Sequence, residues 1–250
     1  MVWLKQLPAL ATGLILLIFV FYGSTLSATP KIQVTGQNTD RTLVRGLDAY
    51  QQDVAAVLSR SITNRSKLLI DTDKVASELK QEYPELGTVS VVLPLASRRP
   101  IVEVSPAKPA LILASSDGAF VVDQEGRAII KTADVESSIK DALPVVQDQS
   151  GLSLERGKSA LPKETVTFVS GVAAQLAAKN ISVQSLVLPP NANQLDVRLA
   201  GQTYFIKMDT RGESRQTVGT FIAVKERLEH DHKVPAEYID VRVPEKAFYK

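Results

Sequence analysis

The residue types that could carry out chemistry are few, and their spacing assembles no catalytic set. A serine followed three positions later by a lysine is typical of penicillin-interacting enzymes. The pattern occurs at Ser77-x-x-Lys80, Ser105-x-x-Lys108 and Ser137-x-x-Lys140. The companion motifs S-D-N and K-T-G are both missing. Three matches without companions indicate a pattern that arose by chance, so we expect no serine nucleophile.

Two further patterns have a weaker relation to known sites. Gly157-Lys158-Ser159 looks like the end of a phosphate-binding loop, but Gly151 stands one residue too far away for G-x-x-x-x-G-K-[ST]. A solvated turn is the better interpretation. His230 and His232 follow a predicted helix and belong to no H-E-x-x-H motif. Cations at the end of a helix complement its dipole, and we favour that role over a zinc site.

One further motif and the composition of the chain exclude several classes of function. Asp71-x-Asp73 lacks the additional oxygen ligands of a calcium loop, so a helix-capping role is favoured. The chain contains no cysteine, which excludes disulfides, thiolate metal sites and a cysteine nucleophile. Its formal net charge is +2, without a long basic run. We therefore expect a protein that is not an enzyme, with no metal, no cofactor, no small-molecule substrate and no nucleic-acid partner.

The element expected to position the rest of the chain is the uncharged stretch Leu7–Leu26. About 20 apolar residues, at 1.5 Å per residue, cross the hydrocarbon core of a bilayer as one helix. We therefore expect a transmembrane anchor over 7–26 and a short cytoplasmic tail over 1–6. The anchor residues are Leu7, Leu14, Ile15, Leu16, Leu17, Ile18, Phe19, Val20, Phe21 and Leu26.

A cleaved signal peptide is the alternative for this stretch. Small residues occur in Ser24–Ala28, but the apolar core exceeds the about 7–15 residues of a typical signal. Leu26 also fits poorly at the −3 position. The flanking charges do not decide the orientation, because Lys5 on one side faces Lys31, Arg41 and Arg45 on the other.

The residues from 31 to 106 predict a small β-α-α-β-β module. Apolar residues recur at helical spacing in two stretches and alternate in three. The expected elements are a strand over Lys31–Val34, helices over Leu47–Ser61 and from Asp71 to Tyr83, and strands over Val89–Leu95 and Arg99–Val104. Neither helix can bury its apolar stripe alone, so both should cover one face of a small sheet.

The residues from 107 to 250 predict a larger mixed α/β module, which makes the whole chain α+β. Strands are expected over Ala110–Ala114, Ala119–Asp123, Arg127–Ile130, Leu143–Val146, Val183–Leu188, Gln194–Leu199, Thr203–Met208 and, at the end, Tyr238–Val243. Helices are expected over Thr165–Lys179 and Thr217–Leu228, and a polar loop over Asp148–Pro162. Asp117-Gly118 is a strong hairpin signal between the first two strands.

Several short motifs, in this order, resemble the FtsQ/DivIB family of cell-division proteins. In residues 31–106 they are Ile32-x-Val34-x-Gly36, Tyr83-Pro84-x-Leu86 and Arg99-Pro100-Ile101-Val102, which resemble a POTRA domain. In residues 107–250 they are Phe120–Gly126 and Tyr238-Ile239-Asp240-Val241-Arg242, which resemble the β domain of that family. The chain departs from the family in Pro106-Ala107-Lys108-Pro109, in its short amino-terminal tail and in its short carboxyl end.

The resemblance implies a non-enzymatic bitopic scaffold of the bacterial divisome. Such a protein has its amino terminus in the cytoplasm and its bulk outside, in the cell membrane at the division septum. Its partners would be FtsB- and FtsL-like small coiled-coil membrane proteins and other divisome components. It would link early division proteins to septal peptidoglycan synthesis.

Strand addition is the physical mechanism that we expect for partner binding. An open sheet edge presents unpaired N–H and C=O groups that an extended segment can complete. The predicted terminal strand Tyr238–Val243 is our candidate edge, although a position inside the sheet remains open. The candidate partner-binding residues are Tyr238, Asp240, Arg242, Val243, Lys246 and Phe248. Alternation places Tyr238, Asp240 and Arg242 on one face.

Two other functions remain possible at this point. POTRA modules also occur in envelope transport or assembly factors outside cell division, which would need a signal peptide and usually a barrel. The chain shows no series of alternating ten-residue strands with girdle aromatics. An envelope hydrolase would need a nucleophile set, which the patterns above do not supply.

Overall fold

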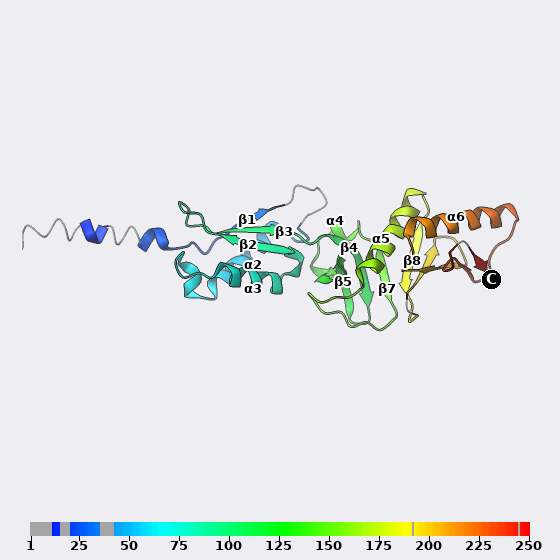
Figure 1. Cartoon of the computed structure of the whole chain (residues 1–250), viewed down its shortest axis with the longest axis horizontal. Helices are drawn as coiled ribbons and strands as arrows, with labels where there is room; N and C mark the ends of the chain where they lie inside the picture. Colours follow the sequence, from blue (N-terminus) through cyan, green and yellow to red (C-terminus); the bar gives the residue numbers. More distant parts are fainter. Residues whose placement is uncertain (1–11, 16–20, 36–42, 192, 245) are drawn as a thin grey trace, which may run out of the picture. The chain divides into compact units, whose positions relative to one another are not determined.

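The computed structural model describes residues 12–15, 21–35, 43–191, 193–244 and 246–250. The chain divides into two compact units, Met1–Pro106 and Ala107–Lys250 (Figure 1). Both combine helices with a sheet, so the expected α+β class agrees with the structure. We call them unit 1 and unit 2 and describe each separately.

The predicted transmembrane helix over Leu7–Leu26 is wrong for the part of that stretch which the structure describes. Residues 12–15 and 21–24 are helical. Within the described ranges, no helix has both the length and the apolar character needed to span a membrane. The expected location as a single-pass membrane protein is corrected for the same reason. Residues 1–11 and 16–20 lie outside the described residues, and with them the predicted cytoplasmic tail and half of the anchor.

Leu26 shows why the end of the predicted anchor was misassigned. Its side chain is buried within unit 1, and its N–H donates to the Arg65 carbonyl at 2.7 Å. Thr25, just before it, forms an isolated bridge with Ser66. These two residues are therefore extended chain packed on unit 1, and they do not belong to a helix.

The helices of unit 1 are α2 (Leu47–Ser59) and α3 (Thr72–Glu82), with short 3-10 turns η2 (Ile62–Arg65) and η3 (Pro84–Leu86). Asp71 caps α3, because its carboxylate accepts the Lys74 N–H at 3.0 Å. The capping role expected for Asp71 is thus confirmed. Pro84 ends α3 as it begins η3, since its ring cannot continue the helical hydrogen bonds.

The sheet of unit 1 has three strands in the order β1-β3-β2. Strand β1 (Lys31–Val34) runs parallel to β3 (Ile101–Ser105), and β2 (Thr88–Val92) runs antiparallel to β3. A return to the far side of β3 requires the intervening helices, which explains the order of elements. The core that joins the sheet to both helices includes Tyr50, Val54, Leu79, Val102 and Val104.

Unit 2 contains one large mixed sheet. Its strands are β4 (Pro109–Ser115), β5 (Gly118–Asp123), β6 (Ala128–Lys131), β7 (Val145–Asp148), β8 (Val183–Leu188), β9 (Gln194–Leu199), β10 (Phe205–Asp209), β11 (Tyr238–Asp240) and β12 (Phe248–Tyr249). Its helical elements are η4 (Thr132–Asp134), α4 (Ser137–Lys140), α5 (Lys163–Ala178) and α6 (Ser214–His230). Across the described part of the unit, the strand order is β12-β11-β10-β9-β8-β7-β4-β5-β6.

The main core of unit 2 unites residues of the sheet with α5 and α6. Helix α5 buries a stripe of apolar residues at helical spacing, among them Val169 and Leu176, and α6 buries Val218 and Phe221. These side chains share one cluster with strand residues such as Val197. Burying such a stripe stabilises both helices far more than intrinsic propensity does.

Candidate partner-binding edge of the large sheet

The predicted edge strand lies one position inside the sheet. Strand β11 pairs in parallel with β10 and antiparallel with β12, so both of its sides are occupied. The prediction that Tyr238–Val243 forms the terminal strand is therefore wrong, and the alternative of a position inside the sheet holds. The edge is β12, which is only two residues long and follows β11 closely.

The outer side of β12 carries the unpaired backbone groups. Lys250 and Tyr238 exchange backbone hydrogen bonds, at 3.1 Å from the Lys250 N–H and 3.4 Å from the Tyr238 N–H. In antiparallel pairs, such hydrogen-bonded positions alternate with positions whose N–H and C=O point away from the partner. Tyr249, opposite Ile239, is a position of the second kind. Among the described strands none pairs with this outer side.

The side chains at this edge are unusually apolar for a solvent-exposed strand. Phe248 is 55% exposed and Tyr249 49%, and Val243 in the preceding turn is 46% exposed. Lys246 is exposed as well. Exposed aromatic side chains beside unpaired backbone groups are the two features that a strand-adding partner uses.

Of the residues predicted to bind a partner, Arg242 is already engaged within the chain. Its Nε and Nη2 donate to the two carboxylate oxygens of Asp240, at 2.9 and 2.6 Å. Its Nη1 donates to Gln194 Oε1 at 2.9 Å, and the Gln194 amide donates in turn to Asp196 at 2.7 Å. Arg242 therefore ties β11 to β9. A bidentate pair of this kind fixes geometry as well as charge.

The same contacts set the charge of the two carboxylates. The hydrogen bonds from Arg242 lower the pKa of Asp240 below its ordinary value, because they stabilise the ionised form. Burial raises the pKa of Asp196, although Gln194, Lys207 and Arg242 oppose that shift. The network thus holds one firmly ionised carboxylate near the edge and one partly desolvated carboxylate farther inside.

Tyr238 belongs to a cluster on one face of the sheet. The Lys207 ammonium lies 3.7 Å from the centroid of the Tyr238 ring, and Phe205 lies 6.1 Å from it, centroid to centroid. Arg198 stacks over Phe205 at 5.1 Å. Cation–π contacts of this kind hold long basic side chains flat on a sheet. Phe248 is opposite Asp240 and so extends this face to the edge.

A groove of about 580 Å³ lies at the carboxyl ends of β10 and β11. Its lining includes Asp209, Arg211, Val241, Arg242, Val243, Pro244 and, from α6, Gln216, Thr217 and Thr220. It adjoins the turn that leads from β11 to β12.

The opposite edge of the sheet is covered. Residues 156–161, which we call the strap, run along β6: the Ala128 N–H donates to the Lys158 carbonyl at 2.9 Å, and the Gly157 N–H donates to the Ala128 carbonyl at 2.7 Å. Arg156 Nε donates to the Ile129 carbonyl at 3.2 Å. Gly157-Lys158-Ser159 thus forms a turn with exposed Lys158 and Ser159, as expected, and its backbone also covers the edge of the sheet.

The hairpin between β5 and β6 holds the strap in place. Asp123 is buried and accepts the N–H groups of Glu125 and Arg127 at 3.0 and 2.8 Å. The Gly126 carbonyl accepts the N–H groups of Ala160 and Leu161. Gly126 has a φ of 85°, and a Cβ there would stand 1.9 Å from the Leu161 carbonyl oxygen. The Asp-x-x-Gly motif thus has a structural role.

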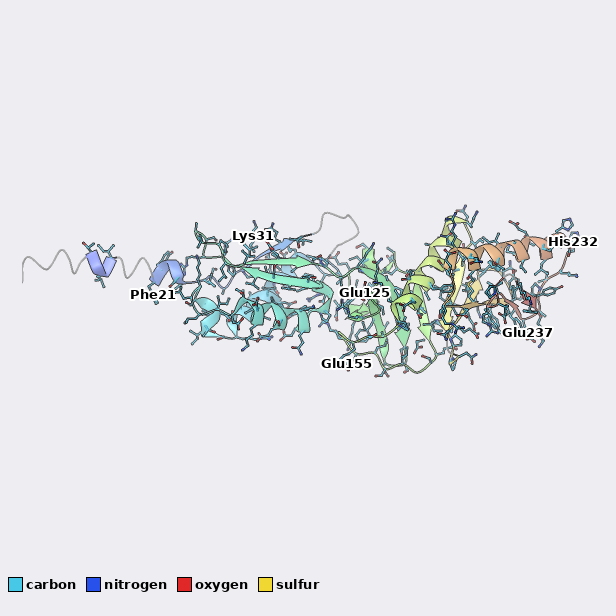
Figure 2. All side chains as sticks on the ribbon, in the orientation of Figure 1. Phe21, Lys31, Glu125, Glu155, His232 and Glu237 are labelled. Carbon is cyan, nitrogen blue, oxygen red and sulfur yellow. The ribbon has the colours of Figure 1, made fainter. Side chains whose placement is uncertain are left out.

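The other candidate chemical groups are dispersed. Ser77 lies in α3, Ser105 ends β3 and Ser137 begins α4. His230 ends α6 with its Nδ1 3.2 Å from Asp231 Oδ1, and His232, labelled in Figure 2, follows it. In the described ranges, no group of three or more His, Cys, Asp or Glu side chains is placed to hold a metal ion.

Sequence reasoning missed Tyr249 and the ion pair between Lys250 and Glu237, 2.8 Å apart. Glu237 is labelled beside the C-terminal strands in Figure 2. The signal was weak: after Pro244 the residues Ala247 and Tyr249 alternate with Lys246, Phe248 and Lys250, over too few positions to establish a strand.

Comparison with known families gave no support for an assignment. No family model matches the chain, and no curated protein matches it. The resemblance to the FtsQ/DivIB family therefore rests on the motifs quoted above and stays a prediction.

Proposed function

We propose that this chain is a non-enzymatic scaffold that captures an extended segment of a partner protein by strand addition at β12. The observation that carries the proposal is the unpaired outer side of β12, which bears two exposed aromatic side chains. A groove lined by Arg242 adjoins the turn that leads to this strand. Main-chain hydrogen bonds would supply affinity, and side-chain contacts with Phe248, Tyr249 and Val243 would supply specificity.

The contacts at the edge support two roles among the predicted residues. Asp240 and Arg242 join β11 to Gln194 of β9, and they would act on a partner by positioning the edge. Val243, Lys246 and Phe248 are exposed and are the residues that a partner would touch. Tyr249 joins them because its backbone N–H and C=O face outward.

For the biological setting, we propose the role that the FtsQ/DivIB resemblance implies. The partner at β12 would be an FtsB- or FtsL-like coiled-coil protein, and the scaffold would link early division proteins to septal peptidoglycan synthesis. An extended segment next to a coiled coil is a suitable ligand, because it can order on the edge without rearrangement of the sheet.

A pair of substitutions at Tyr249 tests strand addition. Tyr249→Pro removes the outward N–H, while Pro keeps an extended backbone. Tyr249→Ala removes the ring but keeps the N–H. Affinity purification of the tagged full chain from cells, followed by mass spectrometry, should recover the coiled-coil partner with wild type, less of it with Tyr249→Ala, and none with Tyr249→Pro. Equal recovery with all three proteins would contradict the proposal.

The biological role has its own test. Cells depleted of the protein should form filaments or unseparated chains, and the wild-type gene should restore division while Tyr249→Pro does not. Normal septation after depletion would remove the division role but leave strand addition at β12 standing.

A further inference from the structure

Unit 1 exposes a group of large aliphatic side chains that its core does not use. Leu95 is 99% exposed, Ile62 89%, Leu68 78% and Leu69 66%. Single exposed apolar residues are common on protein surfaces, but a contiguous group marks an interaction site. Whether these residues form one group depends on how the segments that carry them are joined.

Hydrogen bonds join the segments at one end of unit 1. The Lys67 ammonium donates to the carbonyls of Pro94 and Leu95 at 2.8 and 3.0 Å, which connects the turn after η2 to the β2–β3 connection. The Lys67 N–H donates to the Ser24 carbonyl at 2.7 Å. Residues 24–26 therefore run against both, and the exposed residues belong to one end of the unit.

The turn that carries Leu68 and Leu69 is well ordered by its own hydrogen bonds. Ser66 accepts the Leu68 N–H with its side chain at 3.3 Å and the N–H groups of Leu69 and Ile70 with its carbonyl, at 3.2 and 3.0 Å. This arrangement packs Ile70 against the core and leaves both leucines exposed. The exposure of the two leucines is thus built into the turn.

Two aromatic residues complete the group. Phe21 and Tyr22, on the helical turn at 21–24, are 70% and 63% exposed. The Arg98 guanidinium lies 4.3 Å from the centroid of the Tyr22 ring, and its Nε donates to the Thr25 carbonyl. Figure 2 shows Phe21 projecting from this turn, next to the body of unit 1. We call Phe21, Tyr22, Ile62, Leu68, Leu69 and Leu95 the apolar end.

The charge around the apolar end is mostly positive. Its three segments, 21–31, 60–70 and 93–100, contain no Asp or Glu, although Asp71 and Asp73 follow the second segment at the start of α3. Their basic residues are Lys31, Arg60, Arg65, Lys67, Arg98 and Arg99. Arg60 forms an ion pair with Glu82 of α3, which leaves the positive charge of the other five residues uncompensated by their own segments.

We propose that the apolar end docks unit 1 on the surface of a bilayer that contains anionic lipid. The aliphatic side chains of the apolar end insert at the boundary between headgroups and acyl chains, and Phe21 and Tyr22 lie at the level of the headgroups. The basic side chains around them interact with the lipid phosphates. A surround in which positive charge predominates favours an anionic bilayer over a protein partner, whose surface would have to match both the apolar side chains and the cations. Docking of this kind places side chains in the interface and needs no helix that crosses the membrane.

The absence of cysteine from the sequence permits a local test in the full chain. Single-cysteine variants Leu69→Cys and Leu95→Cys carry an environment-sensitive fluorophore, and Val234→Cys, 76% exposed in unit 2, is the matched control. Vesicles of equal parts phosphatidylcholine and phosphatidylglycerol should shift the emission of the first two labels to the blue. Nitroxide on the lipid chains should quench those two labels several-fold more than the control.

Total binding of the chain to vesicles would not test the proposal, because residues 7–20 form an uncharged apolar run that can bind lipid without the apolar end. If the chain sediments with vesicles while the labels at 69 and 95 stay in water, the proposal is wrong. It is also wrong if the label at 234 responds equally. Vesicles of phosphatidylcholine alone should reduce the emission shift several-fold, and so should Arg65→Gln with Arg99→Gln; an unchanged shift in both would refute the role of the cations.

Discussion

The two edge strands of the nine-stranded sheet differ in whether another segment of the chain bonds to their outer backbone groups. At β6, the strap supplies donors and acceptors to Ala128 and Ile129, and the Gly126 hairpin fixes the strap. At β12, the outer backbone groups of Tyr249 face away from the sheet, beside exposed Phe248. Both edges belong to the same sheet and share one core, so the difference is local.

That difference indicates which edge is available to a partner. Proteins commonly cover, charge or shorten sheet edges because an exposed edge pairs with other chains. Unit 2 covers β6 with one strap from a loop about thirty positions away in the sequence, whereas β12 is limited only by its length of two residues. A short edge resists aggregation, and it lengthens when a partner segment brings its own strand. The comparison therefore supports β12 as the binding edge.

The largest expected effect comes from breaking the covered edge. Gly126→Ala forces a Cβ to within 1.9 Å of the Leu161 carbonyl oxygen at a φ of 85°. We expect a loss of about 3 kcal/mol or more in the free energy of unfolding, from left-handed strain together with displacement of the strap. Urea denaturation followed by circular dichroism measures this.

Gly201→Ala is the matched control for that substitution. Gly201 has a φ of 76°, and a Cβ there meets nothing within 4 Å. Gly201→Ala should lower the free energy of unfolding by about 1 kcal/mol, from the strain of the left-handed conformation alone. If both variants lose the same stability, the contact between Gly126 and the strap does not matter.

A smaller loss should follow from Asp123→Ala in the same hairpin. The buried carboxylate accepts two backbone N–H groups and the Arg127 Nε at 3.1 Å. Its removal leaves those donors without an acceptor, and we expect a loss of about 2–3 kcal/mol in the free energy of unfolding. Thermal denaturation of the variant beside wild type gives the value.

Asp209→Ala is the matched control, because it also removes an Asp–Arg pair but at a less buried position. Asp209 accepts the Arg211 N–H and Nε, both at 3.0 Å, in a more exposed position. Water can replace these bonds, so the loss should be within about 1 kcal/mol. Equal losses at the two positions would mean that burial of Asp123 contributes nothing.

Arg242→Met should have a moderate effect that depends on pH. In the folded protein Arg242 lowers the pKa of Asp240 below its ordinary value, so the pair stabilises the protein at every pH above that ordinary value. The stabilisation disappears as pH falls through the lowered pKa, because Asp240 is then protonated in both states. In the variant, an NMR titration should give a higher pKa for Asp240. The free energy of unfolding should also change less with pH in the acid range than it does in wild type. An Asp240 titration identical to that of wild type would show that Arg242 does not set this charge.

Local patterns predicted much of the fold because many elements are long enough to show a period. Helices α2 and α6 overlap the expected ranges Leu47–Ser61 and Thr217–Leu228, and β8 and β9 have the expected bounds. In each, several apolar residues recur on one face, and burial of that face is what the structure shows. The sequence therefore carries the information for these elements locally.

The candidate site was predicted less well, for physical reasons. Strand β12 has two residues, and α4 has four, so neither spans a full alternation or turn pattern. Without β12, Tyr238–Val243 is taken as the last strand and Arg242 as a free cation, although Arg242 pairs with Asp240 and Gln194. The strap was missed because its bonds to Ala128 join residues about thirty positions apart, which no local period reveals.

The smallest expected effect on stability is the most informative about the open edge. Tyr249→Pro should change the free energy of unfolding by less than about 0.5 kcal/mol, because the N–H it removes faces away from β11 and has no partner in the sheet. Ala128→Pro is the same substitution at the covered edge. It removes the N–H that donates to Lys158 and should lose about 3 kcal/mol. A large loss from Tyr249→Pro would show that β12 maintains the fold, and any loss of partner capture in that variant would then reflect damage to the sheet. A small loss together with lost capture would assign the outward N–H of Tyr249 to binding alone.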